Sequence, residues 1–273
     1  MIFASDNWAG AAPEILAALT RANEAIAPAY GGGPFRARAA GPVSQNFETG
    51  GAGDFLATRR GARGSAPFVL SPPYGMILCH EESHVQMDEC GGPEFFTGGA
   101  KLLPLQGFAA KLTPDAVSAA LDGFPERPPH GMPPKVLSLT QASECGAVYT
   151  QGELTALCAL AHARGLAVHM DGARFANSLA HLGCAPADIT WKAGCMAAEA
   201  VVFFDPARAG DIEFRRKRAG HLWSKQRFIA AQFEAYFEDG LWLRLAARAN
   251  ATAPRLSPGL AAPDGGGIVY PTA

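Results

Sequence analysis

A strand, a helix and a second strand follow one another in the middle of the chain, and this order constrains the fold most. Residues 134–139 (PKVLSL) form a short apolar run next to prolines, which predicts a buried strand. Residues 150–164 predict a helix, because Thr150 and Glu153 have the spacing of a capping box. A second apolar strand is predicted at 166–170. The unit is therefore βαβ, which implies an α/β fold with a parallel sheet.

The second strand leads directly into an aspartate, Asp171, with Arg174 three residues later. In α/β folds, ligands bind at the carboxyl ends of the strands, so this carboxylate is placed where a site is expected. Such a carboxylate can keep the ring nitrogen of pyridoxal phosphate protonated, which makes the ring an electron sink. The alternative is a carboxylate that caps the next helix, which is common.

Other segments show weaker patterns. Residues 13–26 have apolar positions at helical spacing after a proline, and 200–204 (AVVFF) predict another buried strand. Residues 215–245 predict one or two long helices. Residues 48–75 and 251–273 are rich in Gly, Pro, Arg or Ala without periodicity, so linker or disorder is the expectation for both.

Composition indicates a soluble globular protein of the cytoplasm. The chain has 273 residues, 48% hydrophobic, with a net charge of −2, so no basic excess points to nucleic acid. The six cysteines form no CxxC pair and no metal-ligand spacing, which indicates free thiols and no metal site. We expect no membrane span and no signal peptide, because no apolar run is long enough and residues 1–30 lack the pattern.

Several motifs coincide along the chain: Phe3-Ala4-Ser5-Asp6-Asn7, Ala29-Tyr30-Gly31, Leu78-Cys79-His80-Glu81-Glu82-Ser83-His84-Val85, Asp88-Glu89-Cys90-Gly91, Phe95-Phe96-Thr97-Gly98-Gly99-Ala100-Lys101-Leu102, Ser138-Leu139-Thr140-Gln141-Ala142-Ser143-Glu144 and His169-Met170-Asp171-Gly172-Ala173-Arg174-Phe175-Ala176-Asn177. Together they resemble the low-specificity L-threonine aldolases, which belong to the aromatic amino acid β-eliminating lyase/threonine aldolase family of fold-type I pyridoxal phosphate enzymes. The resemblance covers roughly residues 2–47 and 70–250.

The resemblance implies a three-layer, PLP-transferase-like (fold type I) domain with a mainly parallel sheet. This large domain is expected over residues 1–230, and 231–273 are expected to hold a linking helix and the truncated start of a small C-terminal α/β domain. Because fold-type I enzymes build their sites at a dimer interface, the resemblance also implies a homodimer or homotetramer.

The resemblance assigns roles to three residues. His84 matches a histidine that lies over the cofactor ring and handles the substrate hydroxyl. Asp171 matches the aspartate under the pyridine nitrogen, and Arg174 the arginine that pairs with the phenolic oxygen. Without the motif, His84 would be interpreted as a surface histidine in an acidic turn, and Arg174 as a plain surface residue.

Further residues follow from the same comparison. Ser5 and Asp6 match a segment near the substrate carboxylate, with helix capping as the alternative for Ser5. Thr58 falls in the turn expected to bind the cofactor phosphate, but arginines and a proline-bearing stretch replace the expected helix. A local reading-frame disturbance over 50–69 is one hypothesis for this. The basic cluster 215–218 suggests a phosphate or nucleic-acid patch by charge alone, and a helix face at a subunit contact within the family pattern.

The implied reaction is retro-aldol cleavage of a β-hydroxy-α-amino acid, such as threonine to glycine and acetaldehyde, with β-elimination as a mechanistically adjacent outcome. The family turn that carries the Schiff-base lysine has no counterpart here, because Trp191-Lys192-Ala193-Gly194 runs almost directly into the strand that begins near Glu199. The six lysines are 101, 111, 135, 192, 217 and 225, and none has the required context. The sequence therefore predicts a lyase by family with reduced or absent activity. The alternative is a non-catalytic family remnant that acts only as a dimerising or interaction protein.

Overall fold

The computed structural model describes residues 8–24, 26–46, 53–56, 70–125, 127–189, 199–202 and 212–261. The strands are β1 (Gly53–Leu56), β2 (Met76–His80), β3 (Lys101–Leu105), β4 (Pro134–Thr140), β5 (Ala167–Asp171) and β6 (Glu199–Val202). The α-helices are α1 (Pro13–Glu24), α2 (Pro34–Asn46), α4 (His84–Met87), α5 (Gly92–Thr97), α6 (Pro114–Asp122), α7 (Gln151–Ala163), α8 (Phe175–Leu182), α9 (Ile212–Arg218), α10 (Arg227–Phe237) and α11 (Leu241–Ala261). Short 3-10 turns lie at Ala29–Gly31, Pro186–Asp188 and Glu238–Gly240.

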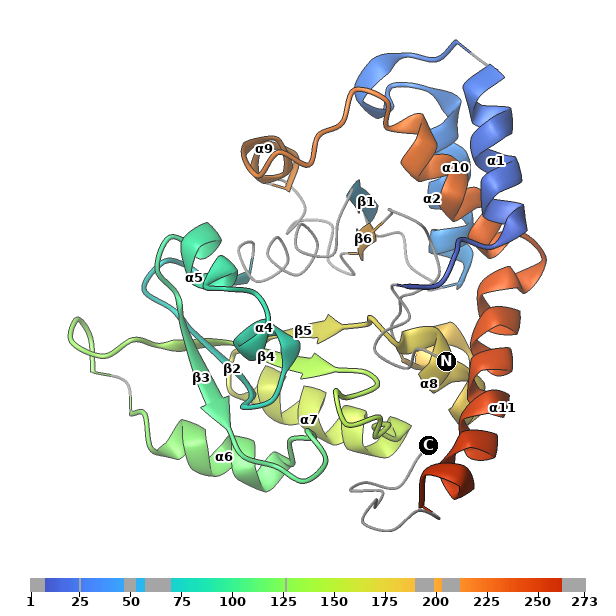
Figure 1. Ribbon diagram of the computed structural model, residues 1–273. Coiled ribbons are helices and arrows are strands. Elements are labelled where there is room, and N and C mark those ends of the chain that lie inside the picture. The colour runs from blue at the N-terminus through green and yellow to red at the C-terminus, as the bar shows by residue number, and fades with distance from the viewer. Residues whose placement is uncertain are drawn as a thin grey trace.

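The centre of the molecule is a four-stranded parallel sheet in the order β3-β2-β4-β5 (Figure 1). All five residues of β2 are buried, as expected for a parallel strand covered on both faces. Alternate residues reach two different cores. Leu78 and Leu137 belong to the large core, whereas Ile77 and Val136 belong to a small one on the other face.

The predicted βαβ unit is confirmed as β4–α7–β5. The side chain of Thr150 accepts the N–H of Glu153, and Glu153 accepts the N–H of Thr150, which completes the predicted capping box. At the other end Gly165 has a φ of 69°. The N–H groups of Gly165 and Leu166 bond the carbonyls of His162 and Ala161, a Schellman ending that only glycine adopts without strain. Helices α6 and α7 lie together along one side of the sheet (Figure 1).

A second set of helices packs beyond β5. Helix α10 contacts both α1 and α2: Arg227 donates to the carbonyl of Ala22 at 3.1 Å, and Arg38 bonds Glu234 at 2.7 Å. Helix α11 runs beside α8 (Figure 1), where the amide of Asn250 donates to the carbonyl of Asn177 at 2.8 Å. The long C-terminal helices therefore connect the N-terminal helices to the sheet layer.

Three sequence expectations were wrong in part. Residues 48–75 were expected to lack structure, yet β1 lies within them and pairs antiparallel with β6, Gly53 opposite Val202. Residues 251–261 continue α11 rather than forming a linker. The segment 215–245 holds parts of three helices, because Gly220 (φ 77°) and Gly240 (φ 63°) turn the chain between them.

The predicted strand at 200–204 is present as β6, but it pairs with β1 outside the parallel sheet. The predicted domain boundary between 230 and 231 falls inside α10, and this division into domains stays a proposal. Of the helices that the structure describes, none combines the length and apolar character needed to cross a membrane.

Candidate active site

Asp171 ends β5 at the carboxyl edge of the parallel sheet. Only 5% of the residue is exposed, and its Oδ1 accepts the N–H of Ala173 at 2.9 Å. The alternative role as a helix cap is wrong, since the N-cap position of α8 is Arg174 and has no side-chain cap. Burial of an ionised carboxylate costs free energy unless N–H groups or cations bond it, and the N–H of Ala173 supplies one such bond.

Arg174 lies at the start of α8, three residues beyond Asp171. Its residue surface is exposed, and its Nη1 reaches the carbonyl of Ala142 at 3.5 Å, the long end of the hydrogen-bond range. The guanidinium of Arg174, from the loop that follows β5, thus lies against the loop that follows β4.

His84 is the first residue of α4, which follows β2. Its side chain is 30% exposed, and Nδ1 lies 2.9 Å from Oε1 of the buried Glu89. The two atoms lie close together without forming an aligned hydrogen bond, since Nδ1 makes none within the described residues. The backbone N–H of His84 donates to Oε1 of Glu144 at 2.9 Å.

The loop 141–150, which joins β4 to α7, links these three groups. The N–H of Gln141 donates to the backbone carbonyl of Asp171 at 2.9 Å. The carbonyl of Ala142 accepts a hydrogen bond from Arg174, and the carboxylate of Glu144 accepts one from the N–H of His84. The structure therefore brings the loops of all three predicted residues to one edge of the sheet, joined through a loop to which the sequence assigned no role.

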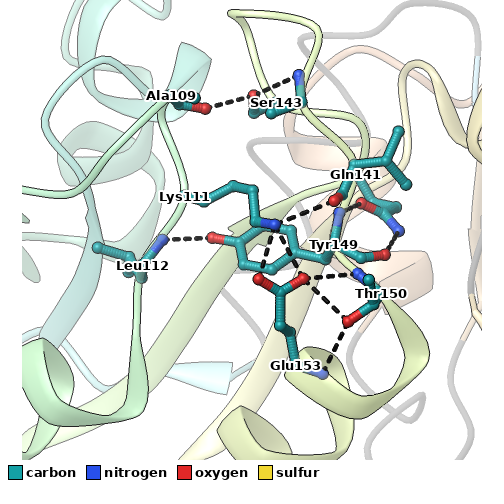
Figure 2. Close-up of polar contacts among 10 residues, drawn as sticks. Ala109, Lys111, Leu112, Gln141, Ser143, Tyr149, Thr150 and Glu153 are labelled. Carbon is teal, nitrogen blue, oxygen red and sulfur yellow. Dashed lines mark hydrogen bonds and ion pairs between the residues drawn. The ribbon is translucent and has the colours of Figure 1, made fainter. Parts of the chain in front are cut away.

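Loop 141–150 is closed by bonds of its own (Figure 2). Gln141 is fully buried, and its side-chain amide both donates to the carbonyl of Tyr149 at 2.8 Å and accepts its N–H at 2.9 Å. Ser143 donates to the carbonyl of Ala109 at 2.7 Å, which ties the loop to the segment after β3. The hydroxyl of Tyr149 accepts the N–H of Leu112 at 2.5 Å, and burial raises the pKa of this phenol.

Cys79, on the strand before His84, is not a nucleophile at neutral pH. Burial raises the pKa of its thiol to about 11, the bond to Ser83 lowers it, and the charges of Glu94 and Glu144 raise it further. Because the thiolate is the reactive form, this buried cysteine is a packing residue.

The described part of the chain holds no group of three or more His, Cys, Asp or Glu side chains that could bind a metal. Thr58, Ser5 and Asp6 lie outside the described residues, as do Trp191 to Ala198 with Lys192.

Comparison with known proteins assigns the chain to a family. The family model of the beta-eliminating lyases matches residues 3–266. The chain belongs to the beta-eliminating lyase family. A low specificity L-threonine aldolase of Pseudomonas sp. (strain NCIMB 10558) is 41% identical over 281 residues, which cover 98% of this chain and 81% of that protein. The protein of the same name in Pseudomonas aeruginosa is 40% identical over the same shares of the two chains.

Solved structures confirm the fold class. A threonine aldolase of Leishmania major superposes with a TM-score of 0.88 at 26% identity, covering 94% of this chain and 78% of that one. The methionine aminotransferase YbdL of Escherichia coli has a TM-score of 0.69 at 12% identity, with 93% of this chain and 69% of that chain covered, and shows likeness of fold alone. The chain therefore has the fold-type I architecture that its motifs predict.

The structure describes five of the six lysines, namely 101, 111, 135, 217 and 225. Lys101 and Lys135 lie at the amino ends of β3 and β4, opposite the carboxyl edge. Lys111 is held by both carboxylate oxygens of Glu153 at 2.8 Å, and Lys217 lies over the ring of Tyr30 at 5.7 Å. Lys101 and Lys135 thus lie at the edge of the sheet opposite Asp171, while Lys111 and Lys217 have partners of their own.

Two carboxylates of the site, Glu89 and Glu144, were given no role by the sequence. Both stand within quoted motifs, but their acidity alone is typical of a solvated surface. The position of Glu144 could have marked it as a site residue, because a carboxylate shortly after a buried strand lies at the edge of the sheet where α/β folds form their sites.

Proposed function

We propose that this chain is a pyridoxal phosphate-dependent lyase of the threonine aldolase type, which cleaves the bond between Cα and Cβ of a β-hydroxy-α-amino acid. Threonine or allo-threonine would give glycine and acetaldehyde. The observation that carries the proposal is the buried carboxylate of Asp171 at the carboxyl edge, with Arg174 and His84 on the loops joined to it. The relatives named L-threonine aldolase supply the substrate class.

The donor set at this edge fits the pyridine ring of the cofactor. Asp171 would accept a hydrogen bond from the ring nitrogen, and Arg174 would pair with the phenolic oxygen, where a guanidinium stabilises negative charge. When bound, pyridoxal phosphate supplies an electron sink for the bond that breaks. Thr58 is proposed to contact its phosphate, and Ser5 and Asp6 the amino-acid substrate.

His84 is proposed to take the proton of the substrate hydroxyl. An imidazole suits this step because its ordinary pKa lies near neutrality. The side chain is accessible, with 30% of its surface exposed, while the buried Glu89 lies beside Nδ1 at 2.9 Å. This leaves Nε2 as the nitrogen to receive the proton.

A second candidate function is association without catalysis. It is favoured by the sequence after Gly194, where four residues separate the Trp-Lys-Ala-Gly motif from Glu199 and leave no place for the lysine-bearing turn. In this case the chain would form a homodimer or homotetramer of the family type without cleaving substrate. A cytoplasmic location is proposed for either function.

A cofactor titration separates the two functions. Pyridoxal 5′-phosphate is added to the purified full chain, the visible absorbance is followed, and borohydride is used to fix the cofactor to any lysine that carries it. For the lyase we expect a saturable band, a modified lysine in the peptide map, and acetaldehyde formed from L-threonine or L-allo-threonine. A folded protein with no band and no acetaldehyde would exclude the lyase and favour association.

Asp171→Asn is the matched test of the ring-nitrogen contact. Removal of the charge should weaken cofactor binding by about tenfold or more, the usual cost of a lost charged hydrogen bond. Asp115→Asn, which changes a carboxylate in the first turn of α6, is the control and should leave cofactor affinity unchanged. Equal affinities for the two variants would contradict the assignment of Asp171.

A further inference from the structure

The N-terminus of α4 lacks the cap that its own sequence offers. Ser83 is the N-cap residue, but its side chain makes no cap bond and instead donates to the carbonyl of His80 at 2.6 Å. The first N–H groups of a helix need acceptors from elsewhere. The N–H of His84 finds one in Glu144, sixty residues later in the sequence, at 2.9 Å.

Glu144 also belongs to the loop that contacts the other two site residues. The N–H of Gln141 donates to the backbone carbonyl of Asp171, and the carbonyl of Ala142 accepts from the guanidinium of Arg174. The carboxylate of Glu144 thus joins the loop of His84 directly to the loop that contacts Asp171 and Arg174.

The closure of loop 141–150 does not use the Glu144 side chain. The bonds between Gln141 and Tyr149 and the bond of Ser143 to Ala109 hold the loop (Figure 2). The hydroxyl of Ser143 also accepts the N–H of Ala147. Removal of the Glu144 carboxylate should therefore leave the loop folded and release only the segment that carries His84.

We propose that Glu144 is a positioning residue that holds His84 over the cofactor ring through its hydrogen bond to the His84 backbone. The proposal rests on the proposed function, which assigns His84 to the ring. A charge-assisted bond from a carboxylate to a backbone N–H is among the stronger hydrogen bonds of a protein, so it is suited to fix a one-turn helix. Glu89, two residues beyond the end of α4, contacts the imidazole of His84: its Oε1 lies 2.9 Å from Nδ1.

The test uses the full chain and three variants. Glu144→Ala removes the acceptor, Glu144→Gln keeps an oxygen at the same place, and Glu82→Ala is the control. Glu82 is an exposed neighbouring carboxylate whose side chain accepts from Cys145 at 3.5 Å. Residue-resolved amide exchange is measured first, without cofactor. We expect exchange at the His84 amide to rise about tenfold or more in Glu144→Ala, and to stay near wild type in the other two.

The second measurement is the visible circular dichroism of added pyridoxal 5′-phosphate, which reports the asymmetry around the bound ring. It should be reduced in Glu144→Ala, restored in Glu144→Gln and unchanged in Glu82→Ala, with equal urea midpoints for all three. An unchanged His84 amide in Glu144→Ala would overturn the proposal, and so would a released amide with unchanged dichroism.

A wild-type chain that binds no cofactor would overturn the proposed function and the positioning role with it. The amide exchange would still show whether the bond between Glu144 and His84 exists, so the two failures can be told apart.

Discussion

Lys111 and Glu153 lie 42 residues apart in the sequence and form an ion pair beside Tyr149. Lys111 Nζ is 2.8 Å from both carboxylate oxygens, 3.0 Å from the carbonyl of Val148 and 5.0 Å from the centre of the Tyr149 ring. Burial raises the pKa of Glu153, but the hydrogen bonds from Lys111 and Thr150 lower it, and the net pKa is lowered. Folding therefore favours the ionised form of this carboxylate.

The charge of Glu153 should make stability depend on pH. Since folding lowers the pKa of Glu153 from its ordinary value of 4.5, its contribution is present above that pH and is lost as pH falls through the folded pKa. Glu153→Gln keeps an acceptor for Thr150 but loses the charge. We expect a cost of about 0.5–1 kcal/mol at pH 7, limited by the side chain's exposure, that disappears as pH falls through the folded pKa of Glu153.

Urea unfolding at several pH values measures this effect. The control is Glu14→Gln, an exposed carboxylate in the first turn of α1. A pH-independent difference between wild type and Glu153→Gln would show that the charge of Glu153 does not contribute.

At the scale of elements, the junction of α10 and α11 depends on an aromatic cluster. Trp242, the second residue of α11, is 2% exposed. Its ring centre lies 5.4 Å from that of Phe237 and 6.4 Å from that of Tyr236, both at the end of α10. The sequence predicted one or two helices across 215–245, but not that aromatic side chains pack across a turn between two helices.

Trp242→Ala should destabilise the protein by about 3–5 kcal/mol, the usual cost of truncating a buried aromatic side chain. Trp223→Ala is the matched control, because this tryptophan is 44% exposed, and it should cost about 0.5 kcal/mol or less. The measurement is urea unfolding of both variants. Similar midpoints for the two would contradict the packing role of Trp242.

At the scale of the whole molecule, the two sheets should differ in stability. β2 has partners on both sides in the parallel sheet, whereas β1 and β6 form a pair. Two-stranded pairs are marginal unless other elements cover them. We expect amides of residues 53–56 to exchange on the order of a hundredfold faster than those of 77–79, measured by hydrogen exchange. Equal rates would show that both sheets unfold as one unit.

The sequence by itself determined the features that depend on neighbours in the chain. The capping box of Thr150, the buried strands and the aspartate that ends β5 were all predicted, and the motif that includes this aspartate was among those that indicated the family. Such features follow from backbone geometry and hydrogen bonds over a few residues, so their signals are local.

Only the tertiary structure decided which distant segments meet. Three contacts join residues that are far apart in the sequence: the pairing of β1 with β6, the hydrogen bond between Glu144 and His84, and the contact of Arg174 with Ala142. These contacts depend on the order of strands in the sheet, which brings the loops after β2, β4 and β5 to one edge. A carboxylate such as Glu144 has the same local pattern whether it faces water or a backbone N–H, and only the fold distinguishes the two.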